Sequence, residues 1–327
     1  MAPFSRESRL WCVMTTKHCL SDHLSHAGAS LFLALGMTLG SLASSRGERI
    51  VFYAPVTTAS VSPKTHITTY TTNNQILTMN VDGSDVRQLT TGTSDCSHPS
   101  WQPGQTHILF HSSGILYVID ANGGGKFAVA ADRGVGADWS SDGKMICYVG
   151  DPLTPPGPMG LWLVAVDPNA KGNKKLGTPI LVSSGDFYGP AWSHDGTRIA
   201  FSDQLEPGGG PHVRVLDLAT GVKTTLTSMT GLLPAWSSSD GKIAFVSGAN
   251  TTGFWQLFIM NPDFTEISQV TSFNNSVLWP AWSPDSLQVA FRIGTGKGWD
   301  AALYKLTLAT GELTLLRDKA DHADWNP

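Results

Sequence analysis

The stretch Gly189-Pro-Ala-Trp-Ser-His-Asp-Gly-Thr-Arg-Ile-Ala-Phe201 decides the fold, because versions of it recur along the chain. In each version a tryptophan is followed nine residues later by an aromatic residue of a second apolar run. A turn sequence such as Asp195-Gly196 lies between them and supplies the positive-φ positions of a tight hairpin. The pattern therefore predicts that each unit forms a strand, a turn and a second strand. The pairs are Trp101 with Phe110, Trp139 with Tyr148, Trp192 with Phe201, Trp236 with Phe245 and Trp282 with Phe291.

Two more strands are expected in each unit, because a third apolar run and then a fourth short run follow every aromatic, as in Ile76–Met79 and Val86–Thr90. Repeated four-stranded units are typical of β-propeller blades. The chain ends on His322-Ala-Asp-Trp325-Asn-Pro327, a first strand without a second, and Arg46–Phe52 is a second strand without a first. We therefore predict an all-β, six-bladed propeller of four-stranded antiparallel blades, closed between the N- and C-terminal strands.

Composition excludes several functions. Only 15% of the 327 residues are charged and the formal net charge is −4, so no basic field for a nucleic-acid backbone is expected. The chain contains no Gly-x-Ser-x-Gly nucleophile elbow, no P-loop and no His-Glu-x-x-His metal helix. We expect no nucleotide binding and no cofactor, and more readily a binding protein than an enzyme.

The first 45 residues differ from the rest. Arg6, Arg9 and Lys17 precede the uncharged stretch Ala27–Ala43, which ends in small residues. This order is typical of a secretory signal peptide, and an N-terminal membrane anchor is the alternative. We therefore assign 1–45 to a signal peptide or anchor and 46–327 to the propeller. The protein is expected to be periplasmic or secreted, in contact with a membrane only through the N-terminal segment if that segment is uncleaved.

Three stretches carry a family resemblance: Pro280-Ala-Trp-Ser-Pro-Asp285, Ser193–Phe201 and Met79–Thr90. They resemble the WD-like repeats of TolB-type six-bladed propellers, and the resemblance covers about residues 46–327. It implies the propeller fold. TolB itself is a periplasmic partner of an outer-membrane lipoprotein and carries an additional α/β domain before its propeller. We expect this chain to be the propeller alone.

The segment before each repeat tryptophan holds the candidate binding residues. His98 and His322 lie three residues before Trp101 and Trp325, where other units carry Gly136, Gly189, Leu233 and Trp279. The resemblance places this segment at the mouth of the central channel. Ordinary polar residues of the rim are the alternative to a binding role. The candidates are His98, Tyr188, Trp279, His322, Asp95 and Asp321.

The repeat tryptophans are assigned to packing between blades, because a residue found in every blade serves a need that every blade shares. They are Trp101, Trp139, Trp192, Trp236, Trp282 and Trp325.

The sequence thus predicts a non-catalytic exported propeller that binds a protein or peptide, with an envelope protein among the candidates. We expect histidines at the mouth to change charge near neutral pH. The alternative is an enzyme with a channel metal site, such as a polysaccharide lyase. It would require His98, His322 and Asp95 or Asp321 to converge on a divalent cation, held in the channel or in a loop.

Overall fold

The computed structural model describes residues 48–327, except 105, 154–156, 205–209, 227, 240, 295–299 and 326–327. The chain divides into a segment 1–44 and a compact unit 45–327. The predicted signal peptide or anchor lies outside the described residues. Within the described ranges, no helix has the length and apolar character that crossing a membrane requires.

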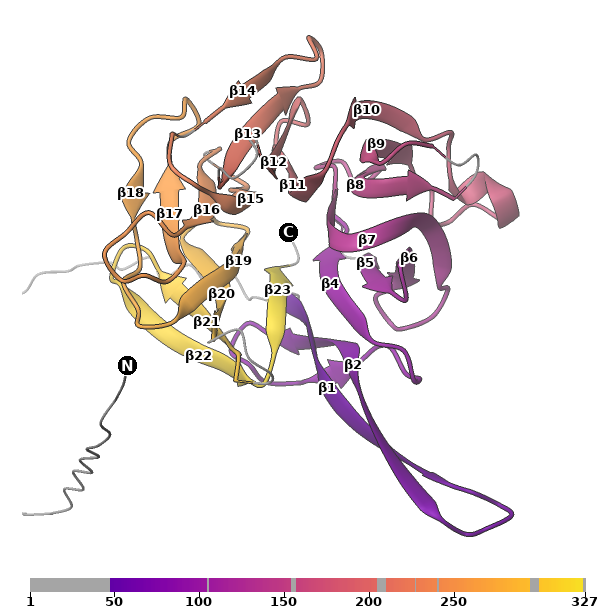
Figure 1. Ribbon diagram of the computed structural model, residues 1–327. Helices are drawn as coiled ribbons and strands as arrows, with labels where there is room; N and C mark the ends of the chain where they lie inside the picture. The colour runs from indigo at the N-terminus through magenta and orange to yellow at the C-terminus, as the bar shows by residue number, and fades with distance from the viewer. Residues whose placement is uncertain are drawn as a thin grey trace, which may run out of the picture. The chain divides into compact units, whose positions relative to one another are not determined.

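The described part of the chain forms six antiparallel blades, numbered here 1 to 6 (Figure 1). Blade 1 contains β23 (Asp321–Trp325), β1 (Arg49–Val61), β2 (Thr68–Asn80) and β3 (Arg87–Gln88). Blade 2 contains β4 (Cys96–Trp101), β5 (His107–Ser112), β6 (Ile115–Asp120) and the first part of β7 (Phe127–Trp139). Blade 3 contains the second part of β7, β8 (Met145–Pro152), β9 (Gly160–Ala165) and β10 (Ile180–Ser184), with the short 3-10 helix η1 (Gly172–Lys175) before β10.

The remaining three blades follow the same plan. Blade 4 contains β11 (Phe187–Trp192), β12 (Arg198–Gln204), β13 (Pro211–Asp217) and β14 (Lys223–Thr225). Blade 5 contains β15 (Leu232–Trp236), β16 (Ile243–Ser247), β17 (Gln256–Met260) and β18 (Ser268–Gln269). Blade 6 contains β19 (Ser276–Trp282), β20 (Gln288–Gly294), β21 (Ala302–Thr307) and β22 (Glu312–Asp318).

The blades form a closed ring around a central channel. The inner strands contact one another in the order β23, β4, β7, β11, β15, β19 and back to β23. In blade 1, Ile50 pairs with Trp325 and Val51 with Asp324, so the N-terminal strand completes the blade that the C-terminal strand begins. The predicted propeller, its four-stranded blades and the closure between the chain ends are confirmed.

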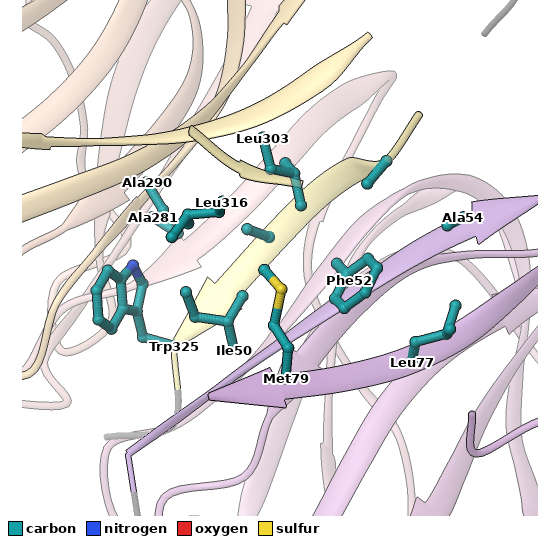
Figure 2. Close-up of a cluster of buried hydrophobic side chains, with 12 residues drawn as sticks. Ile50, Phe52, Ala54, Leu77, Met79, Ala281, Ala290, Leu303, Leu316 and Trp325 are labelled. Atoms are coloured by element: carbon teal, nitrogen blue, oxygen red, sulfur yellow. The ribbon is translucent and has the colours of Figure 1, made fainter. Parts of the chain in front are cut away.

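The repeat residues form the core between blades. The six repeat tryptophans are 3–8% exposed, and the aromatics nine positions later are 0–1% exposed. Figure 2 shows Trp325 beside Ile50, Phe52 and Met79 of blade 1, with Leu316 of blade 6 packed against them. Each tryptophan thus fills the space between neighbouring blades, as its recurrence predicts.

A long hairpin extends from blade 1 (Figure 1). β1 and β2 pair without interruption from Arg49 opposite Asn80 to Val61 opposite Thr68. The sequence analysis ended the first of these strands at Phe52 and began the next at Ile76, so it missed the outer half of the hairpin. Residues 55–74, called the arm below, form that outer half.

Candidate functional site at the channel mouth

A bulge interrupts the inner strand of every blade, three residues before the repeat tryptophan. The strand register shifts there in all six blades. The residue at this position has a positive φ in each blade: His98 48°, Gly136 102°, Gly189 54°, Leu233 55°, Trp279 56° and His322 46°. A left-handed backbone costs a non-glycine residue roughly 1–2 kcal/mol. These six residues are called the bulge ring.

The bulge ring has two unlike halves. On blades 3 and 4 it is bare backbone, and a Cβ on Gly136 would lie 3.3 Å from the Cα of Gly189. On blades 1, 2 and 6 it carries three ring side chains. The centroid of His98 lies 4.7 Å from that of Trp279 and 5.0 Å from that of His322, and Trp279 and His322 are 4.5 Å apart. Large rings therefore occupy left-handed positions that glycine would fill without strain.

A third histidine joins this group. The ring of His111 on β5 lies 5.5 Å from that of His98, in an edge-to-face arrangement. We call His98, His111, Trp279 and His322 the histidine–tryptophan cluster. Tyr53 borders it, with its ring 6.1 Å from that of His98.

Buried charges lie beside the cluster. Arg292 Nε lies 2.9 Å from Asp321 Oδ2 in an ion pair, and Asp321 Oδ1 accepts the backbone N–H of His322 at 2.8 Å. Burial raises the pKa of Asp321, against the opposing effect of Arg292. Burial and the carboxylate of Asp321 both raise the pKa of Tyr53. The arginine and the aspartate neutralise each other, so the cluster faces little net charge.

The histidines are neutral at neutral pH. Burial lowers the pKa of His98 to about 4 and that of His111 to about 3, where His98 adds a smaller like-charge effect. Burial and both neighbouring histidines hold the pKa of His322 well below its usual value. The expectation that these side chains change charge near pH 7 is therefore wrong, because desolvation moves their titration into the acid range.

Below the bulge ring the channel contains a cavity of about 240 Å³. The repeat tryptophan and the two residues before it line the cavity in all six blades, as Pro-x-Trp in blades 2, 4, 5 and 6 and as Ala-Asp-Trp in blades 1 and 3. Two carboxylates in this wall connect blades: Asp324 Oδ2 accepts the N–H of Trp101 at 2.7 Å, and Asp138 Oδ2 accepts that of Trp192 at 2.8 Å. Burial raises the pKa of Asp138 to about 6 and that of Asp324 to about 7.

The structure brings three of the six predicted site residues together, namely His98, Trp279 and His322. Asp321 lies next to them through its bond to the backbone of His322. Tyr188 is 44% exposed on β11 of blade 4, so it is not one of the rings that pack in the cluster. Asp95 is exposed and accepts the backbone N–H of Asn74 at 2.7 Å, at the base of the arm.

The sequence analysis missed Tyr53, His111 and Arg292. All three follow the repeat aromatic directly, where blades 3 and 5 carry Val149 and Val246. The position directly after the repeat aromatic therefore distinguished these blades in the sequence, as the bulge-ring position did. Ring or charged residues replace small or aliphatic ones at both positions in blades 1, 2 and 6, which are neighbours in the closed ring.

Metal coordination is the alternative role of these side chains. Among the described residues, no group of three or more His, Cys, Asp or Glu side chains is arranged to hold a metal ion. The ring of His98 packs edge to face against those of His111, Trp279 and His322, and the rings of Trp279 and His322 are tilted by 34°. The arrangement is that of a packed, uncharged aromatic surface.

Fold and site together define a propeller with an aromatic cluster on one side of its channel mouth, and comparison with known proteins gives its type. No protein-family model matches the chain. The TolB homologue of Chlorobium luteolum is 30% identical over 124 residues, which are 38% of this chain and 27% of that protein. The alignment thus spans about a quarter of the relative's length.

Two solved structures have a similar fold. A structure assigned to TolB of Agrobacterium tumefaciens has a TM-score of 0.61 at 19% identity, covering 74% of this chain and 94% of that one. TolB of Acinetobacter baumannii has a TM-score of 0.63 at 18% identity, covering 85% of this chain and 66% of that one. By fold, the chain is a TolB-type β-propeller.

Proposed function

We propose that the protein is an exported, non-catalytic propeller that binds a protein or peptide of the cell envelope at the channel mouth. The observation that carries this proposal is the half-ring of His98, Trp279 and His322. Their rings occupy positive-φ positions where two other blades carry glycine. Backbone strain held in this way concentrates at functional sites.

The chemistry of the half-ring indicates what it contacts. Its side chains are partly accessible and neutral at pH 7, and they combine apolar ring faces with imidazole nitrogen atoms. Aromatic residues that lie together in this way are typical of the energetic centres of protein interfaces. The sequence resemblance to TolB proteins adds an envelope setting. We therefore infer that an apolar or aromatic segment of the partner inserts against Trp279.

The proposal can be tested without distorting the blades, because glycine is the residue that blades 3 and 4 use at the same position. In a pull-down from envelope extract of the host, Trp279→Gly and the pair His98→Gly/His322→Gly should each lose the partner that the unaltered protein retains. We expect its affinity to fall at least about tenfold, or ~1.4 kcal/mol. Quantitative mass spectrometry of the retained proteins provides the measurement.

Leu287→Ala is the matched control, because Leu287 is 60% exposed in the turn after the repeat tryptophan of blade 6, away from the bulge ring. Thermal melts show that each variant is folded. If the partner is retained equally by all of them, the binding face lies elsewhere. A stoichiometric metal ion in the purified protein would instead favour the enzyme alternative.

A further inference from the structure

The arm is a two-stranded ribbon outside the ring. From Thr57 to Val61 on β1 and from Thr68 to Thr72 on β2, every residue is exposed. Paired hydroxyl groups connect the strands on one face or the other: Thr57 to Thr72 at 2.8 Å, Thr58 to Thr71 at 3.1 Å and Ser60 to Thr69 at 2.7 Å. An isolated hairpin of this kind is marginally stable in water.

Both edges of the arm are open among the described residues. β1 pairs with β23 only through Ile50, Val51 and Tyr53, and β2 pairs with β3 only through Leu77 and Thr78. No strand of the described chain pairs with either edge further out. The arm therefore presents two rows of backbone donors and acceptors to solvent.

The β2 edge of the arm lacks the devices that normally protect such edges, whereas the arm's two prolines, Pro55 and Pro63, lie on β1 and in the end turn. Lys64 in its end turn is the one Lys, Arg, Asp or Glu from Ile50 to Val81. Natural edge strands are protected by charges, prolines or bulges. Here Tyr70 is 72% exposed, Val61 61% and Ile67 60%. An edge strand such as Thr68–Thr72, without charge or proline, is expected to pair with another strand.

We propose that the occupant is a second copy of this chain, whose β2 edge pairs antiparallel with this one over Thr68–Thr72. Charge favours this occupant. Because Thr68–Thr72 carries no charge, two copies of it do not repel each other, and it offers no opposite charge that would attract a charged partner. The segment Thr-Thr-Tyr-Thr-Thr is wholly β-branched or aromatic and contains no proline.

A twofold axis at Tyr70 fixes the register. Tyr70 then faces its own counterpart, and Thr69 of each chain faces Thr71 of the other. The two arms form a continuous four-stranded sheet, which removes one open edge from each. The contact is smaller than the roughly 1,200 Å² of standard complexes, so dimerisation is weak and depends on concentration.

The register makes a sharp test possible. Thr69→Lys combined with Thr71→Lys places introduced lysines opposite each other, whereas Thr69→Lys combined with Thr71→Glu places lysine opposite glutamate. Like charges directly opposite in an antiparallel pair destabilise it, and opposite charges stabilise it. Sedimentation velocity over a concentration series, on the protein as its host produces it, should show a dimer for the unaltered chain. The double-lysine variant should raise the dissociation constant at least about tenfold, and the lysine–glutamate variant should not.

Two further variants complete the test. Replacing Thr57–Thr72 by Asn-Gly, which supports a two-residue hairpin turn, should give a monomer with an unchanged melting temperature. Thr58→Lys combined with Ser60→Lys charges β1 instead and should leave the dimer in place. An unaltered chain that is monomeric throughout overturns the proposal and assigns the arm to a different partner. A dimer that survives removal of the arm, or that responds only to the β1 charges, also overturns it.

Discussion

Deleting residues 322–327 should destabilise the whole ring rather than one blade. Trp325 is 4% exposed and packs against Ile50 and Phe52, which lie on the strand that β23 pairs with. Loss of a buried tryptophan alone costs about 3–5 kcal/mol. The deletion also frees the edge of β1 and removes the bond from Asp324 to the N–H of Trp101. Domains are stable by only about 5–15 kcal/mol, so most of that margin should disappear.

Guanidinium unfolding monitored by circular dichroism measures this loss. The arm-deleted variant is the control, because it removes more residues but none of the core between blades 1 and 6. Trp325→Phe should lie between the deletion and the unaltered protein, since it keeps a ring in the same space. An unfolding midpoint that the deletion leaves unchanged would show that the chain ends do not hold the ring together.

The closure illustrates what could be predicted from the sequence. The offset of nine residues between tryptophan and aromatic fixes the turn length and places both side chains between blades. It also identifies the blade split between the chain ends, because Phe52 falls nine positions after Trp325 when Pro327 is joined to Arg46. The pairing of Ile50 with Trp325 follows from that offset. These features are repeated, and repetition makes a weak local pattern strong.

The arm could not be recognised by the same reasoning. Its strands are rich in threonine, and both of their faces are exposed, so they lack the alternation of apolar and polar residues that indicates a half-buried strand. High β-propensity in Thr68–Thr72 was the remaining signal. His111 was missed for a different reason: its neighbour in the cluster is His98 on the adjacent strand, and the spacing of residues along one strand does not show such a pair.

The free energy of unfolding should change with pH in opposite directions in two variants, one that lacks the cluster histidines and one that lacks the channel carboxylates. The pKa of each cluster histidine is lower in the folded protein than the usual 6.5, at about 4 for His98 and about 3 for His111. The unfolded chain therefore binds more protons in this range, and the free energy of unfolding falls as the pH drops below about 6.5. Each histidine contributes up to about 1.4 kcal/mol per pH unit.

The two channel carboxylates act in the other direction. Their folded-state pKa values, about 6 for Asp138 and about 7 for Asp324, exceed the usual 3.8. The folded protein binds more protons than the unfolded chain between these values, so stability falls as the pH rises from about 4 to about 7. In the unaltered protein the two effects oppose each other over nearly the same range, which flattens its pH profile.

Separate variants should reveal both effects. In His98→Gln/His111→Gln/His322→Gln, the carboxylates act alone, so the free energy of unfolding should rise relative to the unaltered protein as the pH falls from 7 to 4. In Asp138→Asn/Asp324→Asn, the histidines outweigh Asp321, the remaining carboxylate whose pKa burial raises, and the free energy of unfolding should fall by up to several kcal/mol over the same range. Denaturant unfolding at a series of pH values gives the slope of the free energy of unfolding against pH. A loss of stability that is the same at every pH does not alter this slope. Identical slopes in both variants would mean that the cluster histidines are not held neutral by burial, because only their desolvation gives the two sets opposite signs.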